Sequence, residues 1–192
     1  MTAPGFTLDA LDWDSWLETV DVARATPEQV AVLEASLPTA KTSPYYLLLV
    51  HDVAALGQRS PLFNAVMYGP RGLPRAEREL ATVAVSRING CAYCASVHAR
   101  RFAELTKQPE VMQRLLDEGV DTALDARRRA IVDFSAQLTR APQRMTATDL
   151  APLRQAGLSD LEILDLVHAA AMFAWANRLM QTLGEPVRPA QK

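Results

Sequence analysis

Apolar residues recur at spacings of three and four positions along most of the chain, and the strict alternation typical of strands is nearly absent. Leucine, alanine, arginine and glutamate, which favour helices, dominate the same segments. The pattern therefore predicts an all-α protein. The expected helices cover about residues 27–37, 44–56, 75–88, 91–105, 111–118 and 126–138, with shorter apolar turns between residues 57 and 68.

Capping signals mark the ends of several of these helices. Residues 26–29 combine a capping threonine, a proline at the first helical position and a glutamine placed to complete a capping box. A second capping box at Ser159 starts a long C-terminal helix that continues to Leu183. We expect Gly57 and Gly184 to end the helices that precede them, since glycine readily adopts the backbone conformation of a helix end.

Composition and charge narrow the possible classes of protein. The 192 residues, 49% of them hydrophobic, can bury the core of one globular domain. Lysine and arginine number 20 against 22 acidic residues, so no excess positive charge is available for a nucleic-acid backbone. No apolar run approaches the roughly 20 residues that span a bilayer. The N-terminal segment lacks a basic start and carries Asp9, Asp12 and Asp14 where a signal peptide is apolar, so we expect a cytoplasmic protein.

The chain contains two cysteines, Cys91 and Cys94, and His98 follows on the same expected helix. At about 100° per residue, the three side chains fall within an arc of roughly 60° on one helix face. The start of a helix favours a thiolate, which points to Cys91, whereas proximity to a base points to Cys94. Glu79 lies twelve residues before Cys91 on the preceding helix. An antiparallel return of the chain would bring its carboxylate beside the thiols and the imidazole.

Besides thiol redox chemistry, the cysteine pair could serve three roles. A structural zinc site needs about four ligands, and only His51, His98 and His168 are available to join the two thiols. A thioredoxin fold places a strand before its cysteine pair, where this sequence predicts a helix. The cysteines could also only fill core space, as free cysteine often does. The shared helix face with a histidine favours redox chemistry over all three.

An internal similarity links two segments of the chain. An offset of 83 residues aligns Glu79 with Glu162 and Gly90 with Phe173. The second segment lacks both thiols, and a chance match between two alanine-rich helices explains the similarity equally well. An internal pseudo-repeat is therefore one of two open interpretations.

The spacing of Glu79, Cys91, Cys94 and His98 resembles the core motif of the alkylhydroperoxidase D-like proteins in the carboxymuconolactone decarboxylase superfamily, above all their peroxidase-related branch. The resemblance is sharpest over about residues 73–105, the expected redox core of a single 1–192 domain with an N-terminal helical extension of about 1–40. It implies an all-α alkylhydroperoxidase D-like fold, a mostly apolar active-site pocket and a homo-oligomer, either a dimer, a trimer or a hexamer. Tyr93 stands where family enzymes often carry histidine.

The resemblance also implies a mechanism. Cys94 attacks the peroxide, Cys91 resolves the resulting sulfenic acid as a disulfide, and His98 and Glu79 form the proton relay. The reaction uses no haem, flavin or metal, so no cofactor is expected. An external dithiol must reduce the disulfide, and the implied partner is a lipoyl-bearing or thioredoxin-like protein.

We therefore hypothesise a thiol-dependent peroxidase that reduces hydroperoxides. One alternative is a non-catalytic redox sensor or oligomeric interaction protein whose disulfide alters packing. Another is carboxymuconolactone decarboxylase-like lactone chemistry, which does not rely on the cysteine pair. Outside this site, residues 127–129 are three arginines that we interpret as a solvated helix face. Four residues of the C-terminal helix are the candidate contact surface between subunits: His168, Met172, Phe173 and Trp175.

Overall fold

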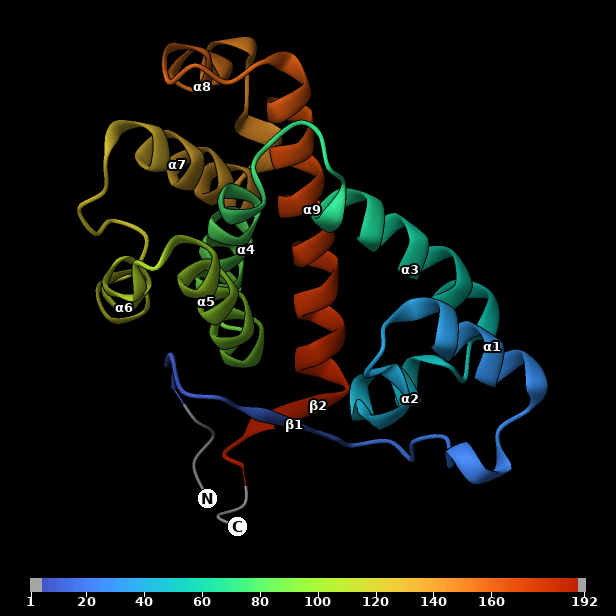
Figure 1. Cartoon of the computed structure of the whole chain (residues 1–192). Coiled ribbons are helices and arrows are strands. Elements are labelled where there is room, and N and C mark those ends of the chain that lie inside the picture. The colour runs from blue at the N-terminus through green and yellow to red at the C-terminus, as the bar shows by residue number, and fades with distance from the viewer. Residues whose placement is uncertain (1–4, 190–192) are drawn as a thin grey trace.

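The computed structural model describes residues 5–189, and most of them are helical (Figure 1). The α-helices are α1 (Pro27–Ser36), α2 (Pro44–Leu49), α3 (Val53–Tyr68), α4 (Arg75–Asn89), α5 (Ala92–Thr106), α6 (Pro109–Glu118), α7 (Ala126–Arg140), α8 (Ala151–Gln155) and α9 (Asp160–Thr182). Two short strands, β1 (Asp12–Ser15) and β2 (Gly184–Val187), pair antiparallel. The predicted fold class is therefore confirmed. None of the described helices is both long and apolar enough to cross a membrane.

Helices α4 and α5 form an antiparallel pair at the centre of the fold, with α7 and α9 packed against α4 (Figure 1). The reversal between them occurs at Gly90, whose φ of 81° lies in the left-handed region that favours glycine. The backbone N–H of Cys91 then donates to the carbonyl of Ser86 at 2.9 Å, which closes the turn. This reversal brings the start of α5 back beside α4, as the predicted site requires.

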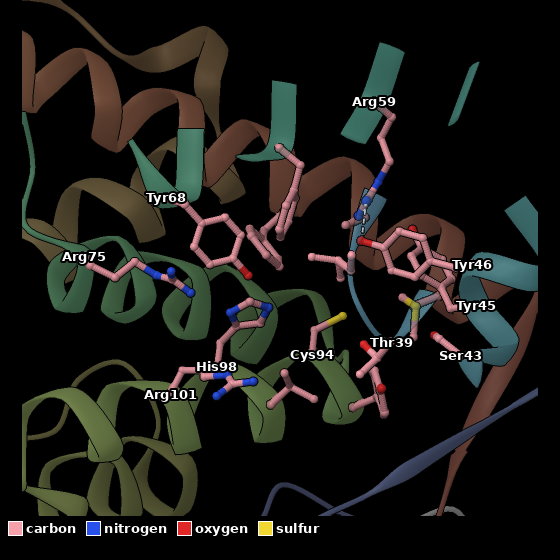
Figure 2. Close-up of a pocket in the computed structure, with 17 residues that line it drawn as sticks. Thr39, Ser43, Tyr45, Tyr46, Arg59, Tyr68, Arg75, Cys94, His98 and Arg101 are labelled. Atoms are coloured by element: carbon pink, nitrogen blue, oxygen red, sulfur yellow. Dashed lines mark hydrogen bonds between the residues drawn. The ribbon is translucent and has the colours of Figure 1, made fainter. Parts of the chain in front are cut away.

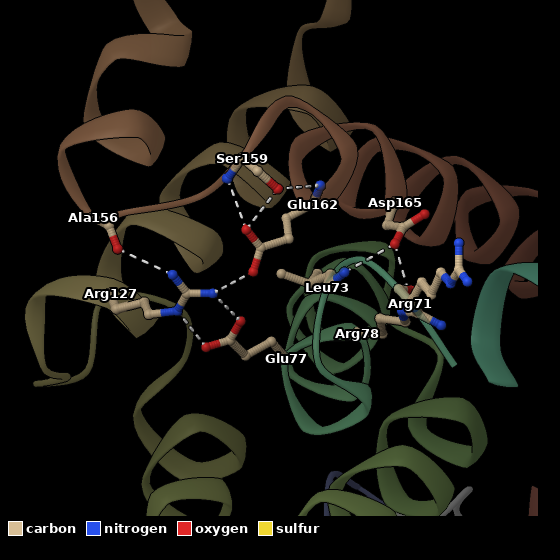
Figure 3. Close-up of polar contacts among 9 residues, drawn as sticks. All are labelled: Arg71, Leu73, Glu77, Arg78, Arg127, Ala156, Ser159, Glu162 and Asp165. Atoms are coloured by element: carbon tan, nitrogen blue, oxygen red, sulfur yellow. Dashed lines mark hydrogen bonds and ion pairs between the residues drawn. The ribbon is translucent and has the colours of Figure 1, made fainter. Parts of the chain in front are cut away.

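Polar contacts fix α9 against α4 and α7 (Figure 3). The capping box at Ser159 is present, and the helix it starts runs for 23 residues. Asp165 accepts hydrogen bonds from the backbone N–H of Leu73 at 2.9 Å and from the buried guanidinium of Arg78 at 3.1 Å. These contacts hold the connection between α3 and α4 onto α9, and they set the position of the α9 residues that reach the site.

The three arginines at the start of α7 are not a solvated face. Arg127 bridges the carboxylates of α4 and α9 (Figure 3), while Arg128 donates to Gln108 at 2.7 Å. Arg129 donates to the backbone carbonyl of Thr122 at 3.0 Å. The prediction was wrong because the charges point to partners in other elements, which the sequence of α7 alone does not reveal.

The helix expected over residues 44–56 is two helices. α2 ends at Leu49, and Asp52 starts α3 by accepting from the backbone N–H of Ala55 at 2.9 Å. α3 then continues through Gly57, the predicted stop, because a glycine inside a helix costs only about 1 kcal/mol and packing can offset that cost. The correction matters because α3 carries residues that line the site.

A helical extension was expected over residues 1–40, but this segment is only partly helical. Residues 1–4 lie outside the described part of the chain. β1 pairs with β2, so Gly184 begins a strand and does not merely end a helix. Trp13 of β1 is buried and donates its indole N–H to the carbonyl of Met180 at 2.9 Å. Each strand has four residues, which is too short for an alternation of apolar and polar residues to reveal it. The strands also come from distant parts of the sequence, so no local turn signal marks their pairing.

The proposed internal repeat does not correspond to two similar structural units at the predicted offset. Gly90 lies at the break between α4 and α5, whereas its counterpart Phe173 lies in the interior of the continuous helix α9. The match therefore reflects two helices of similar composition.

The predicted contact surface on the C-terminal helix divides between two faces of α9. Met172 and Phe173 are buried inside the chain, whereas His168 and Trp175 are exposed. The four residues thus do not form one surface, because the pattern of the sequence does not tell which side of a largely apolar helix faces its own core.

Candidate functional site

The two cysteines lie at the start of α5, as predicted. Cys91 immediately precedes the helix and Cys94 lies in its first turn. Both are free, buried thiols, and their sulfur atoms are 2.7 Å apart. This separation allows a proton to pass between the sulfurs, and it allows a disulfide to form after a small local adjustment.

The pKa values of the two thiols are shifted in opposite directions. The hydrogen bond between the two sulfurs lowers the pKa of Cys91, and the hydrogen bond with the Asn177 side chain adds to this effect. Burial, followed by the neighbouring Cys91 sulfur, raises the pKa of Cys94 well above its ordinary value. The pair therefore loses one proton readily and retains the second, which the two sulfurs share.

A histidine and a carboxylate lie beside this pair. Nδ1 of His98, one turn after Cys94 on α5, is 2.5 Å from Oε2 of Glu79 on α4. Oε1 of the same carboxylate accepts from Nε of Arg75 at 2.5 Å. Because Nδ1 is turned toward Glu79, the Nε2 side of the ring is the side available to a molecule in contact with Cys94.

Glu79 is charged despite having no exposed surface. Burial opposes its ionisation, but the charge and hydrogen bond of His98, together with those of Arg75, outweigh burial and lower the pKa of the carboxyl. The carboxylate next to Nδ1 orients the imidazole so that its other nitrogen, Nε2, is left for a bound molecule. The arrangement can therefore accept a proton at Nε2 and return it.

Cys94 and His98 line a cavity of about 290 Å³ between α2, α3, α5 and α9 (Figure 2). Cys91 is not among its lining residues and borders a separate hollow with Trp13 and Gly90. The predicted common face therefore holds for Cys94 and His98, and Cys91 lies behind them. The cavity is lined by Leu37, Thr39, Ser43, Tyr45, Tyr46, Arg59, Phe63, Tyr68, Arg75, Tyr93, Cys94, Val97, His98, Arg101, Phe173, Ala176 and Met180.

The wall of the cavity is mostly apolar, as the resemblance implies, but it also contains arginines that were not predicted. Arg59, Arg75 and Arg101 line it together with aromatic and aliphatic side chains. The pairing of Arg75 with Glu79 could have been found in the sequence, since the two are four positions apart on one helix. Arg59 had no such signal, because the expected stop at Gly57 excluded it from a helix that faces the site.

Asn177 is a second residue that the sequence analysis did not assign to the site. Its fully buried side chain accepts from Asn89 at 3.0 Å and donates to the hydroxyl of Ser86 at 3.1 Å. The network ties α9 to the last turn of α4 directly before Cys91. It therefore fixes the start of α5, and with it the position of both sulfurs.

Tyr93, the residue between the cysteines that departs from the family pattern, also lines the cavity. Burial raises its pKa above the ordinary value, so the phenol keeps its proton near neutral pH. Tyr93 can donate a hydrogen bond to a molecule in the cavity, but it does not supply a base as histidine would.

The remaining histidines lie away from this cavity. His51 makes a 2.9 Å hydrogen bond to the backbone carbonyl of Glu18, and His168 is exposed on α9. Within residues 5–189, no cluster of three or more histidine, cysteine, aspartate or glutamate side chains is arranged to hold a metal ion. The ligand set that a zinc site would need is thus not assembled in this part of the chain.

Comparisons with known proteins agree with this fold. The model of the carboxymuconolactone decarboxylase family matches residues 55–137, which include Glu79, both cysteines and His98. An uncharacterized peroxidase-related protein from Silicibacter sp. TM1040 is 28% identical, with a TM-score of 0.70 over 86% of this chain and 88% of that chain. An uncharacterized peroxidase-related protein from Ralstonia eutropha JMP134, described as an alkylhydroperoxidase core, is 25% identical. Its TM-score is 0.77 over 88% of this chain and 90% of that chain.

A more distant structure shares only the fold. The debrominase Bmp8 is 13% identical, with a TM-score of 0.68 over 86% of this chain and 88% of that chain. None of the curated proteins compared with the sequence matches it significantly.

The helical fold and the cysteine pair at the start of α5 define a protein of the alkylhydroperoxidase D-like class. The family model over residues 55–137 and the two peroxidase-related structures support the superfamily of alkylhydroperoxidase D-like and carboxymuconolactone decarboxylase proteins for this chain.

Proposed function

We propose that the protein is a thiol-dependent peroxidase that reduces hydroperoxides through Cys91 and Cys94. The observation that carries this proposal is that Cys94 and His98 line one cavity, while the Cys91 sulfur lies 2.7 Å from that of Cys94. A nucleophile, a base and a resolving thiol are thus within reach of one bound molecule. Similarity to a superfamily with peroxidase-related members supports the same activity.

The first step is the attack of Cys94 on the peroxide. His98 accepts one proton from the thiol pair, and the two sulfurs share the remaining proton. Cys91 is the more acidic thiol, so the form that reacts is the less populated one, with this proton on Cys91 and the thiolate at Cys94. This thiolate forms a bond to the terminal peroxide oxygen while the oxygen–oxygen bond breaks. The products are a sulfenic acid on Cys94 and an alkoxide, which takes the proton from His98 and leaves as an alcohol.

The second step regenerates the pair. The Cys91 sulfur attacks the sulfenic acid, a disulfide forms, and the hydroxyl group leaves as water with the proton of Cys91. An external dithiol then reduces the disulfide by thiol–disulfide exchange and is itself oxidised. The chain returns to two free thiols, and the peroxide has received two electrons from the dithiol.

A turnover assay with cumene hydroperoxide tests this proposal, with dithiothreitol, dihydrolipoamide and reduced thioredoxin as separate electron donors. We expect steady peroxide consumption by the wild type and none by Cys94→Ser. In the absence of a dithiol, Cys91→Ser should react once and stop at the sulfenic acid, which a dimedone adduct would reveal by mass spectrometry. The oxidised wild type should show the loss of two hydrogens, as an intramolecular disulfide requires. His98→Gln should slow oxidation by about 10²- to 10⁴-fold, whereas His51→Gln should not.

Two results would contradict the proposal. Oxidation of each chain once, with no turnover in the presence of any of the three dithiols, would favour the redox sensor. A dimedone adduct in Cys94→Ser, and none in Cys91→Ser, would reverse the roles of the two sulfurs.

A further inference from the structure

Arg59 on α3 is a buried cation for which the described residues provide no carboxylate. Its side chain is 7% exposed, and Nη1 donates to the hydroxyl of Tyr46 at 2.8 Å. The guanidinium also lies over three aromatic rings, 5.7 Å from the centroid of Tyr45, 5.2 Å from Tyr46 and 4.7 Å from Phe63. Nε is buried without a hydrogen-bond partner, and no acidic group within residues 5–189 lies close enough for an ion pair.

Such an arrangement is unusual, because a buried charge is costly unless it is paired and hydrogen-bonded. Arg78, which is 2% exposed, shows how a buried arginine is usually stabilised: it pairs with Asp165 and donates to several backbone carbonyls. Cation–π contacts offset part of the cost at Arg59. Most of its five N–H groups are nevertheless left without an acceptor from the described chain, on a residue that lines the cavity of Cys94 and His98.

Two tyrosine hydroxyls accompany this cation. The Tyr46 hydroxyl accepts from Arg59, so its own proton remains for a further acceptor. The hydroxyl of Tyr45, which is 8% exposed, has no hydrogen-bond partner among the described residues. Burial raises the pKa of Tyr45, so this hydroxyl also keeps its proton and can donate it. In Figure 2, Arg59 and Tyr46 lie on one side of the Cys94 sulfur and His98 lies on the other.

We propose that Arg59, Tyr46 and Tyr45 form a subsite for the carboxylate of an organic hydroperoxide, whose peroxide group then reaches Cys94 and His98 in the same cavity. The inference rests on the proposed peroxidase function and adds the class of substrate. A guanidinium and neighbouring hydroxyls provide the hydrogen-bond donors that a carboxylate accepts best.

The charges around the cavity favour a monoanion with a hydrocarbon body. Arg75 is neutralised by Glu79, and Arg101 is exposed and paired with Glu104, so only Arg59 among the lining arginines has a charge to be balanced. The wall between the two ends is largely aromatic and aliphatic, which suits a hydrocarbon segment. One uncompensated cation matches one carboxylate and not a dianionic phosphate.

Binding can be tested without the peroxidase reaction by using phenylacetate and its neutral isostere phenylacetamide as probes. Calorimetry on the reduced wild type should show that the acid binds about 10- to 100-fold more tightly than the amide. Arg59→Met, which keeps an apolar stem without the charge, should bind both probes equally. Arg59→Lys, which retains the charge, should keep part of the preference for phenylacetate over phenylacetamide. It replaces the methionine variant in the test if that variant does not fold.

Arg101→Met is the matched control, because it removes a positive charge from the rim of the same cavity. The preference for the acid should survive in this variant. Equal binding of acid and amide by the wild type, or an equal loss of preference in Arg59→Met and Arg101→Met, would overturn the subsite.

Turnover then separates this inference from the proposed function. The wild type should prefer 4-carboxycumene hydroperoxide to cumene hydroperoxide in kcat/KM, and Arg59→Met should lose this preference. If both hydroperoxides are turned over equally well and phenylacetate binds no more tightly than phenylacetamide, the peroxidase is supported and the carboxylate subsite is refuted. Selective binding of phenylacetate without turnover of either hydroperoxide would retain the subsite and refute the peroxidase.

Discussion

Glu79 connects the stability of the fold to the chemistry of the site. Its two carboxylate oxygens face different partners, Arg75 within the same helix and His98 on α5. The pair with Arg75 forms within one turn of α4, so the carboxylate has a positive partner even before α5 packs onto it. A change at Glu79 would leave the buried ends of both partners without their acceptor, so it should affect stability as well as the proton relay.

We expect Glu79→Gln to lower the free energy of unfolding by about 3–5 kcal/mol at neutral pH, as for other broken buried pairs. In the unfolded chain the carboxyl titrates near its ordinary value of 4.5, and in the folded chain its pKa is lower. Its contribution to stability is therefore complete above that value, and it is lost as the pH falls through the lowered pKa of the folded state. Urea denaturation should show that the deficit of the variant narrows at about pH 3.

The exposed Glu104, which pairs with Arg101, provides the control for this measurement. Glu104→Gln should change the free energy of unfolding by less than about 0.5 kcal/mol at either pH. A Glu79→Gln deficit that is as large at acidic pH as at neutral pH would show that lost packing, and not lost charge, is responsible.

Among the elements, the ribbon of β1 and β2 depends on Gly184. A Cβ atom at this position would overlap the backbone oxygen of Asp14 and the indole ring of the buried Trp13. We expect Gly184→Ala to force the strands apart and to lower the free energy of unfolding by about 1–3 kcal/mol, measured by thermal denaturation. Gly57→Ala is the matched control, because its Cβ would meet Val32 at an ordinary 3.8 Å inside α3.

The control should be neutral or more stable by about 0.5–1 kcal/mol, since alanine favours a helix over glycine. Equal melting temperatures for Gly184→Ala and the wild type would mean that the ribbon adjusts without cost. That result would contradict the role of Gly184 in the close approach of the two strands.

The elements that the sequence predicted well are those specified by local chemistry. The capping boxes at Thr26 and Ser159 start α1 and α9 as expected, because each uses residues within one turn. The β-ribbon and the continuation of α3 through Gly57 were missed, because both depend on packing between distant segments. Gly57 would suit a helix end, and nothing in its immediate neighbours shows that the helix continues.

The same distinction holds for the site. Glu79, Cys91, Cys94 and His98 lie on two consecutive helices, so their spacing and one glycine turn were sufficient to predict that they meet. Arg59 and Asn177 come from α3 and α9, and Phe173 of α9 lies edge-on to His98 with 4.4 Å between ring centroids. These contacts depend on how the outer helices dock onto the α4–α5 pair, which a single sequence does not specify.

Across the whole molecule, α9 has two different faces. One face carries Phe173 and Met180 into the cavity. The other exposes Leu161, Leu164 and Trp175, which are 51%, 51% and 43% exposed. At about 100° per residue these three side chains fall within an arc of roughly 60°, which also contains the exposed His168, so they form one mainly apolar stripe along the outside of the helix. Globular proteins seldom leave such a stripe uncovered unless another surface binds it.

We expect this stripe to contact a second copy of the chain, as the homo-oligomer implied by the resemblance requires. The double variant Leu164→Glu with Trp175→Glu would place two charges in the contact and should shift the wild-type oligomer toward the monomer. Leu105→Glu, at an equally exposed leucine of α5, is the control and should leave the assembly unchanged. Light scattering coupled to size-exclusion chromatography measures the three masses. A wild type that is monomeric at micromolar concentration, or an oligomer that the double variant does not weaken, would show that the stripe has another role.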